Sequence, residues 1–193
     1  MKNLAEGYVS REKHDHLVNA ADDLSSALIF VDDSPGLEPI ELRARARRLK
    51  KKHDIQLIII DYLQMMNYSK FAREGRQREV AGISGALKAM AKELSVPVIV
   101  LSQLSRAPVT RDGKPKLSDL RDSGSIEQDA DVVGLLRRPN RYADEENHED
   151  PTLAILDIAK QRNGPTGEIK LTFVDEITRF ENRASNPRDN QHD

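Results

Sequence analysis

The chain has 193 residues, enough for one domain of ordinary size. It has 30 Lys plus Arg against 32 Asp plus Glu and no Cys, which excludes a strongly basic nucleic-acid binder, a disulfide scaffold and a thiolate metal site. No apolar run approaches the ~20 residues of a membrane span, and the N-terminus lacks a signal-peptide core, so we expect a cytosolic (cytoplasmic) mixed α/β protein with no membrane partner.

The N-terminal region is predicted to contain two helices separated by a short strand. Residues 1–27 and 39–52 have apolar side chains at helical spacing, and residues 28–31 form an aliphatic run that ends in the turn sequence DDSPG. The second helix also carries a basic run, which we interpret as its solvated face. A patch for nucleic acid or a protein partner is the alternative.

A strand, a helix and a second strand follow. Residues 55–60 end in four consecutive aliphatic side chains, typical of a strand that is buried on both faces in a parallel sheet. After a loop over 62–75, residues 76–95 predict a helix whose apolar positions share one face, and residues 98–101 predict a second buried strand. Together these segments form a βαβ unit, which is right-handed in nearly all proteins.

The C-terminal part is predicted to be rich in strands. A loop over 104–124 leads into a short helix opened by the capping box Ser125-Ile126-Glu127-Gln128, and then into a strand over 132–136. An acidic loop at 142–151 precedes a β-hairpin, whose strands at 153–159 and 168–174 flank the turn sequence NGPTG. We expect the last ten residues, 184–193, to be a disordered tail.

Two polar residues stand where the predicted parallel strands end. Asp61 follows the first strand and Gln103 the second, so both belong at the carboxyl edge of the sheet, where open α/β sheets bind ligands. A carboxylate there suits the water shell of Mg²⁺, and an amide there can bond a terminal phosphate or orient water. Ordinary loop hydrogen bonds are the alternative for each residue.

Cations mark two further segments. Lys160 and Arg162 are two residues apart near the hairpin turn and therefore face the same way, as groups that neutralise phosphate in a neighbouring subunit would; an exposed hairpin end is the alternative. Arg121 precedes Gly124, which permits close approach of the backbone, and the following helix start offers free N–H groups to a phosphate. A capped surface loop is the alternative there.

One motif is missing. A nucleotide-hydrolysing sheet of this kind needs GxxxxGK[ST] to hold the phosphates. The chain's one Gly-Lys pair, at 113–114, is followed by Pro115, and Pro108 occupies the position of the first glycine.

Five segments together resemble the C-terminal motor domain of DnaB-type replicative DNA helicases, a RecA-like ATPase. They are DDSPG, IIIDYLQMM, RQREVAGISGALKAMAKELSVPVIVLSQLSR, SDLRDSGSIEQDADVV and AKQRNGPTGEIKLTF, in the family's order. The resemblance implies an α/β RecA-like fold, with a mostly parallel sheet flanked by helices and a C-terminal β-hairpin. Residues 1–183 would be an incomplete motor domain, because the family's P-loop and catalytic Glu precede anything that aligns with this chain.

The resemblance also implies roles for individual residues. Asp61 corresponds to the Walker B carboxylate that serves Mg²⁺, and Gln103 to the glutamine that couples the phosphate state to the DNA loop. Lys160 and Arg162 correspond to the hairpin cations that reach the ATP of the next subunit. The loop that touches single-stranded DNA corresponds to Arg121, Asp122 and Gly124.

The family relation implies part of a homohexameric, ATP-driven helicase that moves on single-stranded DNA, with primase and a helicase loader as further partners. Without a P-loop, the chain alone is expected to be inactive. A stand-alone, non-catalytic remnant that binds single-stranded DNA or helicase subunits is the alternative. A recombination-type RecA-like ATPase is less favoured because of the segments DLRDSGSIEQDAD and KQRNGPTG.

Overall fold

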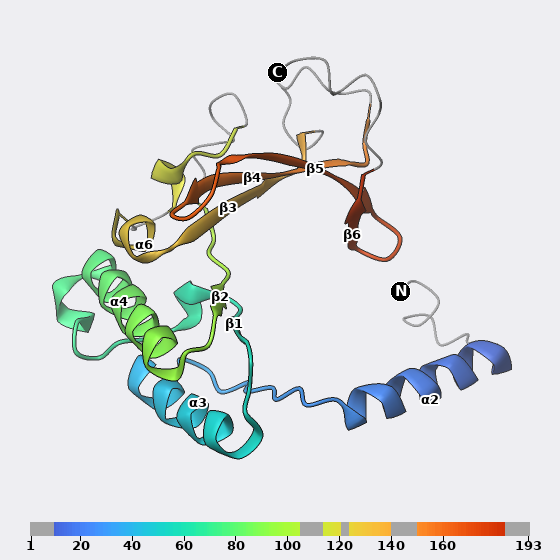
Figure 1. Cartoon of the computed structure of the whole chain (residues 1–193), viewed down its shortest axis with the longest axis horizontal. Helices are drawn as coiled ribbons and strands as arrows, with labels where there is room; N and C mark the ends of the chain where they lie inside the picture. Colours follow the sequence, from blue (N-terminus) through green and yellow to red (C-terminus); the bar gives the residue numbers. More distant parts are fainter. Residues whose placement is uncertain (1–9, 105–113, 121–123, 140–149, 184–193) are drawn as a thin grey trace.

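The computed structural model describes residues 10–104, 114–120, 124–139 and 150–183. Its elements form two sheets joined through helices (Figure 1). A two-stranded parallel sheet packs against α3 (Pro39–His53) and α4 (Arg76–Leu94), and a four-stranded antiparallel sheet contains the C-terminal strands. Figure 1 shows the parallel pair between α3 and the antiparallel sheet.

The parallel sheet confirms the predicted βαβ unit. Strands β1 (Ile58–Ile60) and β2 (Val98–Val100) pair in register, with Ile59 opposite Ile99. The intervening helix α4 ends at Ser95, whose left-handed backbone (φ 51°) turns the chain into β2. The apolar face of α4 fills the core, through Val80, Ile83, Leu87, Met90 and Leu94.

The prediction that the first strand is buried on both faces is wrong, and the second strand, predicted as buried, is also exposed on one face. Alternate side chains of a strand point to opposite faces, and only one face of this sheet is covered. Ile58 and Ile60 pack against the α4 core, whereas Ile59 is 61% exposed and Ile99 is 49% exposed. Within the described ranges, therefore, the sheet has one open aliphatic face.

The N-terminal segment differs most from the sequence prediction. Helix α2 (Arg11–Ser26) forms within the predicted range, but its apolar stripe stays exposed and the helix stands apart from α3 and α4 (Figure 1). Residues 28–31 form no strand, and Val31 is 87% exposed. The segment makes no ladder with any described strand, and β-propensity alone does not hold an unpaired strand in water.

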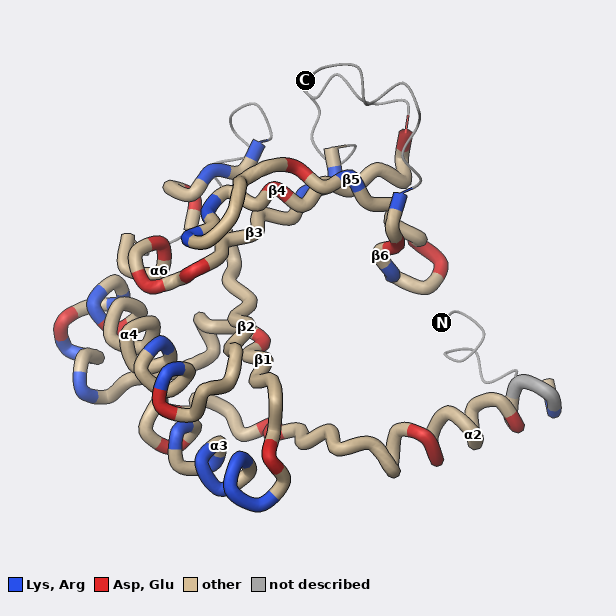
Figure 2. The backbone as a smooth tube through the Cα atoms, in the orientation of Figure 1, with Lys and Arg blue, Asp and Glu red and all other residues tan. Residues whose placement is uncertain are grey.

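Helix α3 shows why a basic run need not be a free patch. Arg43 and Arg47 both bind Glu93 of α4, and their guanidinium groups, Arg47 foremost, lower the pKa of that carboxyl. Arg45 binds Asp32, and Lys50 binds Asp54 at 2.6 Å. Figure 2 shows that Lys and Arg are concentrated along α3. Arg43, Arg47, Arg48, Lys51 and Lys52 are exposed, so the basic face is solvated as predicted, but four cations of α3 also form ion pairs with carboxylates of the chain. Ile40, expected on the apolar face, is 70% exposed.

Between the helices, the chain predicted as a loop is partly ordered into short helical turns. The 62–75 segment holds the 3₁₀ turns η1 (Leu63–Met65) and η2 (Ala72–Glu74), and η3 (Leu117–Asp119) follows later. An isolated bridge pairs Leu104 with Leu120. The predicted acidic loop at 142–151 lies almost wholly outside the described residues, as does the predicted tail at 184–193.

The second sheet contains the predicted hairpin. Strands β3 (Val132–Arg137), β4 (Leu153–Gln161), β5 (Gly167–Val174) and β6 (Arg179–Asn182) pair antiparallel in chain order. A register shift interrupts the β3–β4 pairing between Val133 and Gly134. The short helix α6 (Gly124–Asp129) precedes β3 and packs against α4. It starts one residue before Ser125, so Ser125 lies inside the helix and is not the N-cap that the capping box predicted.

Candidate functional site

The strand-end residues Asp61 and Gln103 lie at the same edge of the parallel sheet. Ile60 pairs with Val100, and the Leu101 N–H donates to the Ile60 carbonyl at 2.9 Å, so the two chains leave the sheet side by side. Both side chains are exposed at this edge. The shared edge agrees with the sequence prediction, and the binding of one ligand by this carboxylate and this amide stays a prediction.

A residue that the sequence analysis missed joins these two strand ends. The side-chain amide of Gln64 donates to the Ser102 hydroxyl at 3.0 Å and to the Gln103 carbonyl at 3.3 Å. Its Oε1 accepts from the Gln103 N–H at 3.3 Å. Gln64 thus clips the loop that follows Asp61 to the loop that carries Gln103.

The same loop is fixed to the start of α4. The Arg76 guanidinium donates to the Gln64 carbonyl at 2.8 Å and to the Glu79 carboxylate at 2.7 Å. Burial would raise the pKa of Glu79, but the Tyr68 N–H at 2.7 Å and Arg76 outweigh it, so the pKa lies below its usual range. A charged Glu79 holds both the loop and Arg76 in place.

Lys160 and Arg162 come together at the C-terminal end of α6. The Lys160 ammonium donates to the Glu127 carbonyl, and the Arg162 guanidinium donates to the Gln128 carbonyl at 2.6 Å. The last carbonyls of a helix have no partner within the helix, so cations are well placed there. The two hairpin cations share one side, as their spacing predicted.

Asp131 contacts Arg162 through its backbone carbonyl and its carboxylate, and the same carboxylate contacts α4. The Arg162 N–H donates to the Asp131 carbonyl at 2.9 Å, and its Nε lies 3.6 Å from the Asp131 carboxylate. Lys88 of α4 binds the same carboxylate. The Lys88 hydrogen bond, helped by the charge of Arg162, lowers the pKa of Asp131 against the opposing effect of desolvation.

The predicted DNA loop is only partly described. Gly124 is the first residue of α6, and an added Cβ there would meet no heavy atom within 4 Å. Arg121 and Asp122 lie outside the described residues. The structure therefore fixes where this loop ends, at the N-terminal end of the helix whose other end holds Lys160 and Arg162.

The donor set at Asp61 suits an indirect metal contact. Across the described ranges, no three His, Asp or Glu side chains come close enough to form a metal cluster. Asp61 is a single exposed carboxylate at the sheet edge. One such carboxylate fits Mg²⁺ that keeps most of its water and takes its other ligands from phosphate.

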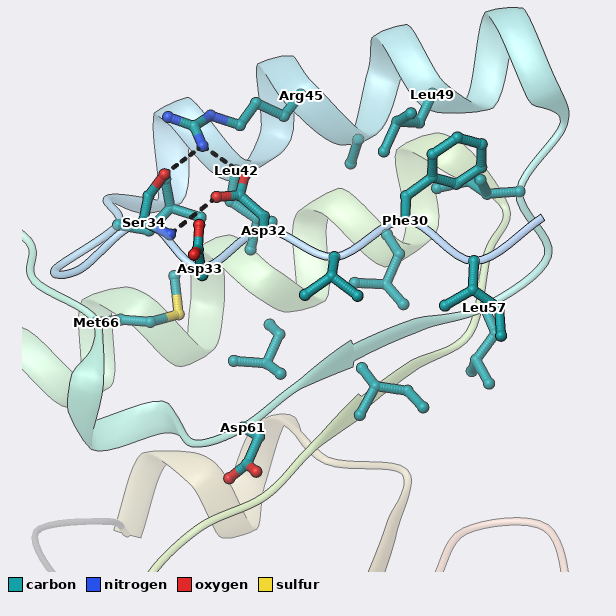
Figure 3. A pocket seen from close by; sticks show the side chains of 18 of the residues that line it. Phe30, Asp32, Asp33, Ser34, Leu42, Arg45, Leu49, Leu57, Asp61 and Met66 are labelled. Carbon is teal, nitrogen blue, oxygen red and sulfur yellow. Dashed lines mark hydrogen bonds and ion pairs between the residues drawn. The ribbon is translucent and has the colours of Figure 1, made fainter. Parts of the chain in front are cut away.

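An open cavity of about 900 Å³ lies between residues 28–37, α3 and β1. Its walls are mainly aliphatic, and of the predicted site residues that the structure describes, Asp61 alone lines it (Figure 3). At its rim Arg45 binds Asp32 and also donates to the Ser34 hydroxyl at 2.9 Å. The Arg45 hydrogen bond to Asp32, together with hydrogen bonds from Ser34 that include its N–H at 3.1 Å, lowers the pKa of Asp32 to about 2. An aliphatic wall does not supply the N–H groups that a phosphate needs.

Comparisons with known proteins agree with this architecture. The family model described as "DnaB-like helicase C terminal domain" matches residues 1–182. The replicative DNA helicase DnaB of Geobacillus stearothermophilus is 46% identical over 182 residues, and the replicative DNA helicase DnaC of Bacillus subtilis is 47% identical over the same length. These alignments cover 94% of this chain but 40% of each relative.

Solved structures give the same result. The solved structure of an ATPase domain superimposes with a TM-score of 0.85 at 35% identity, covering 95% of this chain and 64% of that one. A DnaB-like replicative helicase, studied with its primase interactions, gives a TM-score of 0.83 at 37% identity, covering 92% of this chain and 43% of that one.

No helix in the described part of the chain is long and apolar enough to span a bilayer. The match over residues 1–182 and the superposition on both solved structures assign the fold and the relationship together. This chain belongs to the DnaB-like helicase C-terminal domain family.

Proposed function

We propose that this chain is the distal part of the motor of a hexameric replicative DNA helicase, which uses ATP hydrolysis to move along single-stranded DNA and separate the duplex. Membership of the family supports this proposal. The observation that carries it is the separate placement of two groups of side chains. Asp61 and Gln103 share the sheet edge, whereas Lys160 and Arg162 gather at the end of α6.

The first group would serve a nucleotide bound at this chain's own sheet edge. Asp61 would hold the water shell of Mg²⁺, and Gln103 would bond the terminal phosphate or orient the attacking water. Mg²⁺ supplies charge neutralisation on ATP when bound. The Gln64 clip supports these roles because it fixes the spacing of the two loops.

The second group would serve the nucleotide of the neighbouring subunit. In the described part of the chain, the side-chain polar contacts of Lys160 and Arg162 are all with residues 127–131, and none is with Asp61 or Gln103. This separation supports a role at a phosphate outside this chain's own sheet edge. An arginine in this role neutralises charge that develops on the transferred phosphoryl group.

The DNA contacts are proposed at the start of α6. Arg121, Asp122 and Gly124 would touch the backbone of single-stranded DNA, which positions the strand without reading its sequence. Primase is proposed as a further partner because the solved structure of one similar helicase concerns its interactions with primase. A helicase loader is proposed on family grounds alone.

A second candidate function is a stand-alone, non-catalytic subunit that binds single-stranded DNA or other helicase subunits. These 193 residues contain no GxxxxGK[ST], and the motor part and the separate subunit would share every residue of this chain. The genomic DNA upstream of Met1 separates the two candidates. An in-frame GxxxxGK[ST] supports the motor, and a ribosome-binding site directly before Met1 supports the separate product.

The motor proposal is tested with mixed rings, which contain two kinds of subunit that are each inactive alone. A full-length chimera is made in which this chain replaces the matching segment of the Geobacillus stearothermophilus helicase, with either Asp61→Asn or Arg162→Ala. Each variant alone should lose ATP turnover by about 10³-fold or more. Mixed rings should regain part of the activity, because some interfaces pair an intact Asp61 with an intact Arg162.

Native mass spectrometry shows whether the rings have mixed. No recovery in rings that have mixed would place Arg162 in cis or make its role structural, and would contradict the proposal. If a chimera fails to assemble, the same two substitutions at the aligned positions of the Geobacillus stearothermophilus helicase decide the question.

A further inference from the structure

Asp131 occupies a junction of three elements. It lies between α6 and β3, and its carboxylate binds Lys88 of α4. Its backbone carbonyl accepts from the backbone N–H of Arg162, just beyond β4, and its carboxylate also pairs with the Arg162 guanidinium. The neighbouring carboxylate of Asp129 takes a different partner, the buried Ser84 hydroxyl of α4, at 2.7 Å. Two carboxylates two residues apart thus have separate partners, and only Asp131 contacts the hairpin.

The contacts of Arg162 fix one edge of its guanidinium. Nε faces the Asp131 carboxylate and Nη2 donates to the Gln128 carbonyl. A guanidinium has five N–H donors in a rigid plane, so the hydrogen bond of Nη2 at 2.6 Å and the ion pair of Nε at 3.6 Å together restrict the direction of that plane. The Arg162 side chain is 51% exposed, so about half of it is accessible to a ligand.

Stability does not explain this arrangement. The Asp131 side chain is 59% exposed, and ion pairs between exposed groups contribute little to folding because water screens them. The ion pair matters instead for the orientation of the Arg162 side chain. A long side chain that must meet a phosphate loses less entropy on binding when it is already held in one direction.

We propose that Asp131 is the positioning residue for Arg162: its carboxylate, with the Gln128 carbonyl, aims the guanidinium at the phosphate of the neighbouring subunit and ties it to α4 through Lys88. This inference rests on the proposed trans-acting role of Arg162. It adds a residue that touches neither nucleotide nor DNA and acts through Arg162.

The test is a double-mutant cycle in the full-length chimera. Asp131→Asn should lower kcat for ATP by about 10-fold or more, with KM changed less than about twofold, because orientation matters most in the transition state. In an Arg162→Ala background, the same substitution should change kcat less than about twofold, because no guanidinium remains to be aimed. Asp131→Glu should recover part of the loss.

Asp129→Asn is the matched control, because it removes one carboxylate charge two residues away. An asparagine still accepts from Ser84, so turnover should stay within about twofold of the parent. The temperature of unfolding should be nearly unchanged in both Asp131→Asn and Asp129→Asn. A loss of kcat that follows the loss of thermal stability would make Asp131 structural and overturn the inference.

The remaining outcomes separate this inference from the proposed function. Full activity of Asp131→Asn, or losses that simply multiply with those of Arg162→Ala, would overturn the positioning role while the function stands. If Arg162→Ala itself is fully active, the proposed function fails. The positioning is then decided on the ¹⁵N-labelled chain, where Asp131→Asn but not Asp129→Asn must shift the Arg162 Nε–H resonance.

Discussion

The Gln64 side chain bonds residues 38 and 39 positions away, which is why no local pattern marks it. In the sequence, Gln64 is one polar residue in a loop after a strand. Its function as a clip depends on two strands running parallel, so that their ends meet. Strand-end positions alone predict which residues lie at the sheet edge, but they do not predict the residues that hold this edge in place.

The two hairpin cations should differ in their contribution to turnover. In the full-length chimera, we expect Lys160→Ala to cost less kcat than Arg162→Ala. The ammonium is a single flexible charge, whereas the planar guanidinium is held by Asp131 and the Gln128 carbonyl. Steady-state ATPase rates at saturating ATP measure the difference, and an equal or larger loss for Lys160→Ala would contradict it.

Asp32 gives a pH-dependent measurement that is independent of activity. Its pKa lies at about 2, against an ordinary value of 3.8, because Arg45 and Ser34 stabilise the carboxylate. Since the folded-state pKa is lowered, the Asp32 contacts stabilise the fold fully above about pH 4, and this contribution is lost as the pH falls toward the folded pKa. NMR titration of the Asp32 carboxyl should show the low midpoint, and Arg45→Ala should move it up toward 3.8.

The candidate site shows what residue patterns predict. The edge position of Asp61 and Gln103 followed from two aliphatic runs, because parallel strands end at one edge. The shared side of Lys160 and Arg162 followed from their spacing along a strand. Their partners on α6 and at Asp131 did not follow, because these contacts depend on how the hairpin packs against a helix some 30 residues earlier.

Among the elements, α4 does most to hold the N-terminal part together, because its whole apolar face is buried. Ile83 is fully buried, so Ile83→Ala should lower the free energy of unfolding by about 2–5 kcal/mol. Ile40→Ala removes the same atoms from an exposed position on α3 and should cost about 0.5 kcal/mol or less. Urea unfolding followed by circular dichroism measures both, and similar costs would contradict the described core.

Element prediction succeeded where the periodic pattern was long and failed where burial depended on a neighbour. The 19-residue helix α4 has five turns of consistent spacing, and its limits were predicted within one residue. Residues 28–31 and Ile59 have strongly apolar local sequence, yet they stay exposed in the described structure. A short aliphatic run shows that a side chain suits burial, but it does not show which element will cover it.

At the scale of the whole molecule, the charge balance limits DNA affinity. The net charge is −2, and four cations of α3 already pair with carboxylates of the chain. One subunit should therefore neutralise only about one to three phosphates, which gives a log–log salt slope of about −0.7 to −2 on single strands. Fluorescence anisotropy across salt concentrations measures the slope.

Two sets of substitutions test which residues bind the single-stranded DNA. Arg121→Ala should weaken binding by a similar factor on all sequences, because a phosphate contact carries no base information. Replacing Arg48, Lys51 and Lys52 with glutamine should have a smaller effect. A steep slope that disappears with the α3 substitutions would instead favour the basic run as the nucleic-acid patch.

The chain alone should not hydrolyse ATP. Hydrolysis requires backbone N–H groups and a lysine around the β- and γ-phosphates, and these 193 residues contain no GxxxxGK[ST] to supply them. Asp61 offers a single exposed carboxylate, and the cavity beside it has aliphatic walls. The purified chain should therefore show no turnover above a buffer control, with or without single-stranded DNA.

The full-length chimera, which restores the phosphate loop, should be active and should lose that activity with Asp61→Asn. Turnover by the chain alone that is abolished by Asp61→Asn would show that another segment holds the phosphates, and the assignment of the chain as a dependent part of a motor would then be wrong.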